Sequence, residues 1–206
     1  MRKLIVAAFI SLDGVVQAPG GPEEDTSGGF AHGGWIWPFA DGSGEVMGGA
    51  FASPFELVLG RRTYNIFAAY WPHVPEGAPH QGIADQFNGV TKHVATHHHA
   101  TLGWQNSRAL GPDVAAAIRE LKRGDGPNLL TQGSSDLVRQ LLATDLVDEL
   151  RLLVYPLLLG RGKRLFDDHT QASAFRLEAS KTSPSGVLIN RYVRDGKVRT
   201  GSFAHD

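Results

Sequence analysis

Two segments of the chain place a glycine and polar side chains between an apolar run and a helix-like pattern. In "LVLGRRTYNIF" (residues 57–67), Gly60 is followed by two adjacent arginines. In "LLTQGSSDLV" (residues 129–138), Gly133 is followed by two serines. The first turn of a helix has unpaired N–H groups and a partial positive charge, so each junction is suited to hold an anion. Arginine forks and serine hydroxyl groups add donors that match phosphate oxygens.

The two junctions together favour binding of a dinucleotide. If their strands are neighbours in a parallel sheet, both junctions lie at one edge, where open α/β sheets bind such ligands. The alternative is that each glycine only makes a tight turn and the arginines are solvated. We favour binding because the same pattern occurs twice in one chain. The paired cations Arg61 and Arg62 also suit the extra 2′-phosphate that distinguishes NADPH from NADH.

The pattern of apolar residues predicts one domain, residues 1–206, in which strands and helices alternate. This alternation is typical of an α/β layered fold with a largely parallel sheet, and two final strands in succession indicate an antiparallel edge. The expected strands are residues 4–10, 56–59, 92–99, 100–104, 128–131, 148–160 (broken near Pro156), 175–183 and 186–196. The expected helices are residues 44–52, 63–70, 113–124 and 134–143, with a loop over residues 71–90.

Composition excludes several classes of function. The 206 residues include 20 basic and 21 acidic side chains, which argues against broad nucleic-acid binding. The chain has no cysteine, so it has no disulfides and no cysteine–zinc site, and a reducing, cytoplasmic location is expected. No apolar run reaches the roughly 18 residues of a membrane helix, and we read the apolar N-terminal run as a buried strand.

A glycine-rich segment, residues 18–50, follows the first expected strand. It contains ten of the 25 glycines together with Trp35, Trp37 and Phe39. We expect it to form the wall and lid on the substrate side, where Trp35 and Trp37 could stack on a flat heterocycle. The alternatives are that the tryptophans cover the edge of the core and that the segment is an unrelated insertion.

Five short motifs carry a resemblance to a known family. "SLDG", "LGRRTY", "GSSDLVRQLL", "LVDEL" and "PLLLGRGKRLF" come in the order found in the dihydrofolate reductase-like superfamily. The chain most resembles the reductase domain of riboflavin biosynthesis, the C-terminal domain of a bacterial bifunctional deaminase-reductase, and its stand-alone relatives. The likeness covers nearly the whole chain. It implies a three-layer sandwich with a mixed, mostly parallel central sheet, and a homodimer.

The resemblance also implies an NADPH site. It would place Arg61, Arg62 and Thr63 beside the adenosine-side phosphates and Thr96 near the adenine ribose. Ala8 would lie near the nicotinamide. The cofactor-binding residues that it implies are Ala8, Gly60, Arg61, Arg62, Thr63, Thr96, Gln132, Gly133, Ser134 and Ser135, with the last three on the pyrophosphate.

The catalytic residues are harder to assign. The folate enzymes orient the pterin with a carboxylate on the helix after the first strand, where this chain has its glycine-rich segment. Asp41 and Glu45 are candidates within that segment, but neither aligns with the folate carboxylate. Asp13 could contact substrate or cofactor, or it could bond its own backbone in an Asp-Gly turn. The absence of cysteine excludes the zinc deaminase half of the bifunctional riboflavin enzyme.

Two further patterns are weaker. His93, His97, His98 and His99 resemble a metal-ligand cluster, but no carboxylate is close in sequence, and we expect no metal site. "GRGK" (residues 160–163) lacks the earlier glycine and the Ser or Thr of a phosphate-binding P-loop.

These observations predict an NADPH-dependent reductase that transfers hydride to a small planar heterocycle. By resemblance, that heterocycle is a pterin or a pyrimidine like 5-amino-6-ribosylaminouracil. In such reactions the cofactor supplies the hydride, and the protein positions it and excludes water. The alternatives are a non-catalytic dinucleotide-binding protein that kept the fold and a dimeric scaffold with no ligand.

Overall fold

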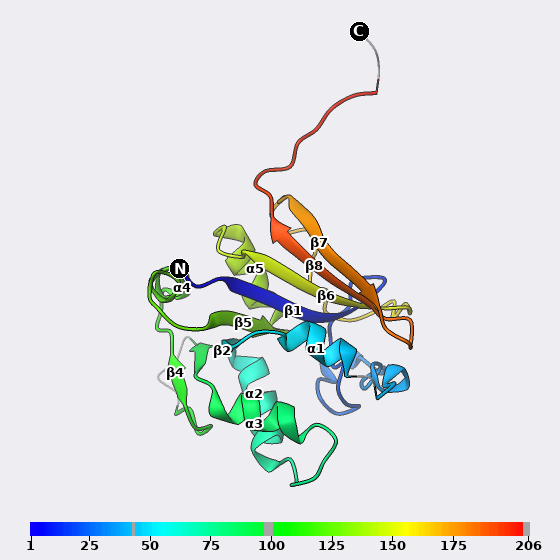
Figure 1. The fold of residues 1–206 in the computed structure, drawn as a ribbon, viewed down its shortest axis with the longest axis vertical. Helices are drawn as coiled ribbons and strands as arrows, with labels where there is room; N and C mark the ends of the chain where they lie inside the picture. Colours follow the sequence, from blue (N-terminus) through cyan, green and yellow to red (C-terminus); the bar gives the residue numbers. More distant parts are fainter. Residues whose placement is uncertain (43, 97–100, 204–206) are drawn as a thin grey trace.

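The computed structural model describes residues 1–42, 44–96 and 101–203, in which strands and helices alternate along most of the chain (Figure 1). The strands are β1 Leu4–Ser11, β2 Phe55–Gly60, β3 Lys92–Ala95, β4 Ser107–Ala109, β5 Asn128–Gln132, β6 Glu149–Tyr155, β7 Phe175–Thr182 and β8 Leu188–Arg194. The helices are α1 Glu45–Phe51, α2 Arg61–Tyr70, α3 Gln81–Gly89, α4 Val114–Arg123 and α5 Ser135–Ala143, with 3-10 turns η1 Ser27–Gly29, η2 Trp37–Phe39 and η3 Trp71–His73.

The strands form one mixed sheet in the order β4-β3-β2-β5-β1-β6-β8-β7. Neighbours from β4 to β6 run parallel, whereas β8 is antiparallel to both β6 and β7. This arrangement confirms the predicted mostly parallel sheet with an antiparallel C-terminal edge. None of the helices in the described part of the chain is long and apolar enough to cross a bilayer.

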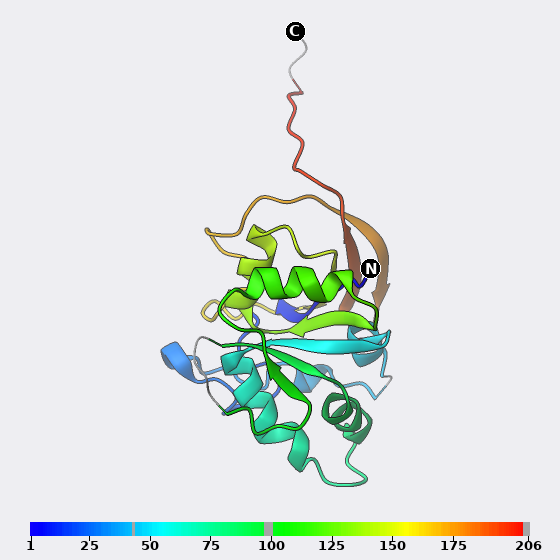
Figure 2. The same cartoon turned by 90° about the vertical axis from the view of Figure 1, so that its left-hand side faces the viewer.

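Two hydrophobic cores cover the two faces of the sheet. Strand β1 is buried along its whole length, because its alternate residues face opposite sides. Ile5 and Phe9 belong to the core under α1, α2 and α3, whereas Leu4 and Val6 belong to the core under α4 and α5. Figures 1 and 2 show these two groups of helices flanking the sheet, which gives the expected three layers.

The predicted loop over residues 71–90 was wrong in its second half. Helix α3 occupies residues 81–89, and η3 follows α2 directly. The three prolines that suggested a loop all precede α3. Within the helix, Ala84 and Phe87 are three residues apart, and both are buried against the sheet. A short helical stripe of this kind is stabilised by its tertiary contacts rather than by its local composition.

The predicted strand over residues 100–104 was also wrong. The described residues 101–104 are not strand, and β4 begins three residues later, at Ser107. Trp104 is buried by other contacts: its indole N–H donates to Asn88 Oδ1 (2.7 Å), and its amide donates to the Tyr64 hydroxyl group (2.9 Å). Strand β3 ends at Ala95 rather than continuing through the histidines, and residues 97–100 lie outside the described part of the chain.

Candidate functional site

A crevice forms at the carboxyl ends of β2 and β5. The two strands are parallel neighbours, so the two glycine-to-helix junctions lie at the same edge of the sheet. Helix α2, which follows β2, packs into one core through Tyr64. Helix α5, which follows β5, packs into the other core through Leu137 and Val138. Where neighbouring strands lead to helices on opposite faces, the connections diverge and leave an opening, which is where open α/β sheets bind ligands.

The Ser134 side chain bonds the two junctions together. Its Oγ accepts a hydrogen bond from the Gly60 amide (3.0 Å) and donates one to Thr63 Oγ1 (2.8 Å). Both Gly133 (φ 63°) and Ser134 (φ 53°) have left-handed backbone conformations, and for serine this conformation is unfavourable. A Cβ atom on Gly60 would lie 3.3 Å from Ser134 Oγ, so glycine permits this close approach.

The helices that begin at the crevice have no side-chain cap among the residues that the structure describes. Asp113 caps α4 by accepting a hydrogen bond from the Ala116 amide (2.9 Å), whereas α2 and α5 have no such bond. Ser134 holds the N-cap position of α5, but its hydroxyl group bonds Gly60 and Thr63 instead of a first-turn amide. The first-turn amides of both helices therefore remain suited to an anion.

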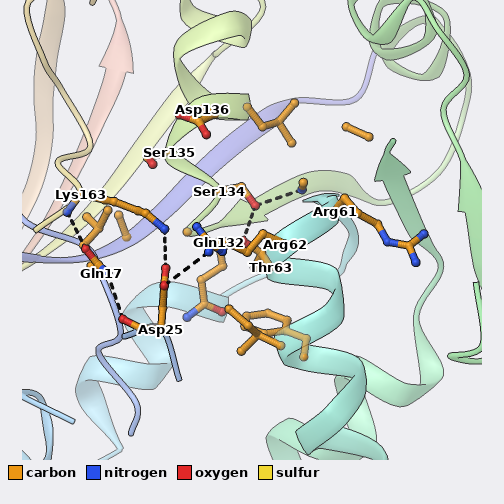
Figure 3. Close-up of a pocket in the computed structure, with 18 of the residues that line it drawn as sticks. Gln17, Asp25, Arg61, Arg62, Thr63, Gln132, Ser134, Ser135, Asp136 and Lys163 are labelled. Atoms are coloured by element: carbon orange, nitrogen blue, oxygen red, sulfur yellow. Dashed lines mark hydrogen bonds and ion pairs between the residues drawn. The ribbon is translucent and has the colours of Figure 1, made fainter. Parts of the chain in front are cut away.

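A cleft of about 280 Å³ opens at these junctions (Figure 3). An outer hollow beside α2 shares Asp25, Arg61 and Arg62 with the cleft. The structure brings together along the cleft all ten residues that the sequence predicted to bind the cofactor: Ala8, Gly60, Arg61, Arg62, Thr63, Thr96, Gln132, Gly133, Ser134 and Ser135.

The two arginines occupy different environments. Helix α2 begins at Arg61, two residues earlier than predicted, so both arginines lie in its first turn. The Arg61 guanidinium group lies over the Tyr64 ring (5.6 Å), and its Nη1 is buried with no hydrogen-bond partner among the described residues. Arg62 is exposed and lies 3.8 Å from Asp25. Both arginines nevertheless line the cleft, where cations of this kind suit an anionic ligand.

Sequence reasoning missed several polar residues that line the cleft, among them Gln17, Glu24, Asp25 and Lys163. Lys163 Nζ forms an ion pair with Asp25 Oδ2 at 2.6 Å. Partial burial raises the pKa of Asp25, but hydrogen bonds from Lys163 and Ser27 outweigh it, so the net pKa is lowered. Lys163 lies within the "PLLLGRGKRLF" motif, which was the available signal. The other three have no local signature.

Glu24 differs electrostatically from its neighbour Asp25. Burial raises the pKa of Glu24, and the Asp25 carboxylate adds to this, whereas hydrogen bonds from the Gly20 and Gly21 amides offset only part of it. The cleft therefore places a carboxyl group that holds a proton more readily than usual beside one that stays ionised. Two titratable groups whose pKa values are pushed apart can divide acid and electrostatic roles between them.

Asp13 does not line the cleft. Its carboxylate accepts hydrogen bonds from the Leu159 amide (3.1 Å), the Gly160 amide (2.8 Å) and the Ser11 hydroxyl group (2.6 Å). Partial burial raises the pKa of Asp13, but these three hydrogen bonds outweigh that effect. The net pKa lies below its usual value, so the carboxylate stays ionised. Asp13 therefore holds the segment after β6 against the end of β1, which favours a structural reading over substrate contact.

The other sequence candidates are also not among the residues that line the cleft. Asp41 accepts a hydrogen bond from the Ser185 amide (3.2 Å), and Glu45 pairs with Lys181 (2.7 Å), near the β7–β8 hairpin. Trp35 is buried: its indole N–H donates to the Gln17 carbonyl group (2.8 Å) and its ring packs edge-on against a core tyrosine. Trp37 is exposed. Of the glycine-rich segment, Ala18, Pro19, Glu24 and Asp25 line the cleft.

The histidines give no metal centre in the described residues. His93 is buried, and its Nε2 lies 2.8 Å from Glu56 Oε2. The same Glu56 oxygen also pairs with Arg2. His97, His98 and His99 lie outside the described residues. Within the described ranges, no three His, Cys, Asp or Glu side chains are grouped to hold a metal ion.

Comparison with known proteins identifies the family. The family model for the RibD C-terminal domain matches residues 2–189. The chain belongs to this family. Among curated proteins, this RibD C-terminal-like chain is 23% identical to the uncharacterized protein YyaP of Bacillus subtilis (strain 168) over 189 residues, 91% of this chain and 92% of that protein.

Solved structures share the fold of the RibD C-terminal domain. A pyrimidine reductase-like protein of Corynebacterium diphtheriae matches 97% of this chain and 93% of its own, with a TM-score of 0.59 and 16% identity. Dihydrofolate reductase of Enterococcus faecalis, complexed with NADP(H), matches 94% and 96%, with a TM-score of 0.60 and 14% identity. The fold is therefore the dihydrofolate reductase-like fold that the sequence motifs indicated.

Replacing Ser134 with alanine should destabilise the RibD C-terminal-like domain. Ser134→Ala removes the acceptor of the Gly60 amide and the donor to Thr63, and a buried group left unpaired costs about 1–3 kcal/mol. Urea denaturation followed by circular dichroism would measure the loss. Ser135→Ala is the matched control, because its hydroxyl group makes no hydrogen bond within the described residues, and it should change stability by under about 0.5 kcal/mol. Equal effects of the two variants would contradict the bridging role of Ser134.

Proposed function

We propose that this protein is an NADPH-dependent reductase that transfers hydride to a small planar heterocycle of pterin or pyrimidine type. The carrying observation is a cleft that opens between two helix N-termini without side-chain caps in the described residues and that Arg61 and Arg62 line. This arrangement fits a ligand with several phosphate groups. Membership of the RibD C-terminal domain family and the likeness to an NADP(H)-bound dihydrofolate reductase support a reductase of riboflavin or folate type.

Different residues of the cleft would bind different phosphate groups of the cofactor. Arg61, Arg62 and Thr63 would hold the adenosine-side phosphates, and the turn at Gly133 and Ser134 would hold the pyrophosphate. Gly133 and Gly60 let the backbone approach closely, since neither presents a side chain to the ligand. When bound, NADPH supplies the hydride, and the protein orients it and excludes water.

Glu24 is the proposed source of the proton. Reduction of a C=N bond adds hydride at carbon and a proton at nitrogen. The raised pKa of Glu24 keeps a proton on its carboxyl group to higher pH than usual, whereas Asp25 stays ionised. A general acid works best when its pKa lies near the working pH. This assignment replaces the sequence candidates, whose carboxylates bond elsewhere.

Cofactor selectivity tests the phosphate site. Wild-type protein should bind NADPH more tightly than NADH in calorimetry. Arg61→Ala or Arg62→Ala should weaken NADPH binding by about 1.5–3 kcal/mol, roughly ten- to hundredfold, because a charge-assisted pair is lost. NADH binding should change much less. Arg119→Ala, on the exposed side of α4, controls for general loss of charge. Equal affinities of the unmutated protein for NADPH and NADH would refute the site.

Turnover separates the reductase from a non-catalytic dinucleotide-binding protein that retains the fold. NADPH oxidation should accelerate with a dihydropterin or a ribosylaminouracil-type pyrimidine. The rate should fall as pH rises through the pKa of Glu24, since the acid must be protonated, and Glu24→Gln should abolish that fall together with most turnover. Tight NADPH binding with no acceptor-dependent oxidation across both ring classes would support the non-catalytic alternative.

We also propose a homodimer. Leu12 and Leu158 are exposed beside each other at the ends of β1 and β6, where the Leu12 amide donates to the Leu157 carbonyl group (2.9 Å). Exposed apolar surface of this kind often pairs symmetrically. Light scattering at micromolar concentration should give twice the 22.2 kDa of one chain. Leu158→Asp should shift the mass toward one chain, whereas Val198→Asp, at another exposed apolar position, should not. A wild-type mass of 22.2 kDa would exclude the dimer.

A further inference from the structure

The loop after β1 places the Asp25 carboxylate at the wall of the cleft, between cations from two other segments. Asp25 Oδ2 lies 2.6 Å from Lys163 Nζ, and Asp25 Oδ1 lies 3.8 Å from Arg62 Nη2. The Asp25 side chain is only 10% exposed, whereas that of Arg62 is 62% exposed. Figure 3 shows the Asp25 carboxylate joined to both of these cations by dashed lines.

Asp25 is held in this position by a buried amide. Gln17 is 4% exposed, and its Nε2 donates to the backbone carbonyl groups of Asp25 and Ser27, both at 2.9 Å. Its Oε1 accepts from the Lys163 amide at 2.9 Å, so one side chain fixes both members of the ion pair. The Ser27 amide (3.1 Å) and hydroxyl group (2.6 Å) also donate to Asp25 Oδ1. The pair is therefore preorganised, unlike a chance contact between two flexible surface side chains.

The cations that Asp25 engages also face the part of the cleft suited to phosphate. Lys163, Arg62, Gly133 and Ser134 all line the same opening as Asp25. A carboxylate brings one negative charge, whereas a phosphate monoester brings about 1.5 to 2 at neutral pH and three strong acceptor oxygens. A phosphoryl group can therefore take over cations that a carboxylate holds, while a weakly charged ligand cannot.

We propose that Asp25 is an internal competitor for the phosphate-binding cations of the cleft. It occupies Lys163 and Arg62 until a phosphate-bearing ligand displaces it, and it thereby sets the charge a ligand needs in order to bind. This role rests on the proposed function only in that the cleft receives a phosphate-bearing ligand. The phosphoryl group belongs to the dinucleotide or to a phosphorylated substrate, and the experiment distinguishes these sources.

Two variants that break the same ion pair should change binding in opposite directions. Calorimetry with inorganic diphosphate as the probe should show about three- to tenfold tighter binding to Asp25→Asn, because the competitor is gone while its shape remains. Lys163→Gln should bind about tenfold more weakly, because a cation is gone. Glu23→Gln is the charge-matched control, since Glu23 lines the outer hollow but forms no ion pair in the described part of the chain. It should bind diphosphate like the wild type.

A purely structural ion pair gives a different result. If Asp25 and Lys163 only fasten the loop, both variants lose the same contact and diphosphate binding falls in both, which would overturn the proposal. Unchanged binding to Asp25→Asn would overturn it as well. Thermal unfolding checks that each variant is folded. Should Asp25→Asn fail to fold, Ser27→Ala loosens the carboxylate with a smaller change and should also tighten diphosphate binding, again opposite to Lys163→Gln.

Saturating NADPH distinguishes the two sources of phosphate. If NADPH abolishes diphosphate binding to Asp25→Asn, the dinucleotide's own phosphates replace the carboxylate. If diphosphate still binds beside NADPH, the released cations serve a phosphorylated substrate. Either result supports the competitor role and assigns the ligand. The opposite signs of the two variants are measured without any cofactor, so a failure of NADPH selectivity would count against the proposed function alone.

Discussion

Parallel pairing of β2 with β5 places two strand–helix junctions side by side, and the Ser134 hydroxyl group bonds one junction to the other. Helices α2 and α5 then diverge to opposite faces of the sheet, which opens the cleft between their N-termini. The hydroxyl group that would normally cap α5 is used in this bridge. The helix amides are consequently left for a ligand, and the unfavourable backbone conformation of Ser134 is maintained by the contacts around it.

The charges in the cleft are arranged so that a phosphate can replace a carboxylate as the partner of the cations. Arg61 carries a buried nitrogen that has no partner among the described residues, whereas Arg62 and Lys163 share the Asp25 carboxylate. An apo site with three unpaired cations would repel itself and hold its loops loosely. An internal carboxylate lowers that repulsion and orders the loop after β1, while its modest charge leaves the cations available to phosphate. Stability of the empty cleft and affinity for an anion are thus set by the same residue.

One wall of the cleft is built from loop segments rather than from helix N-termini. Gln17 and Asp25 come from the segment after β1, and Lys163 comes from the segment after β6. The tryptophans of the same glycine-rich segment do not line the cleft, since Trp35 supports Gln17 from the core through its indole N–H. In this way the aromatic residues act on the cleft indirectly, by fixing the polar residue that organises it.

The sequence by itself determined the layered fold and the two junctions at which the cleft opens. Both depend on local patterns: the apolar alternation of β1 and the glycine-to-helix junctions at Gly60 and Gly133 can be recognised within a dozen residues. Tertiary structure alone decided the rest. Helix α3 forms because Phe87 is buried in the core, although three prolines precede the helix. Asp25 pairs with Lys163, which lies 138 positions further along the chain. Such contacts leave no periodic or local trace, because their free energy comes from burial and charge pairing that exist only after the sheet has brought distant segments together.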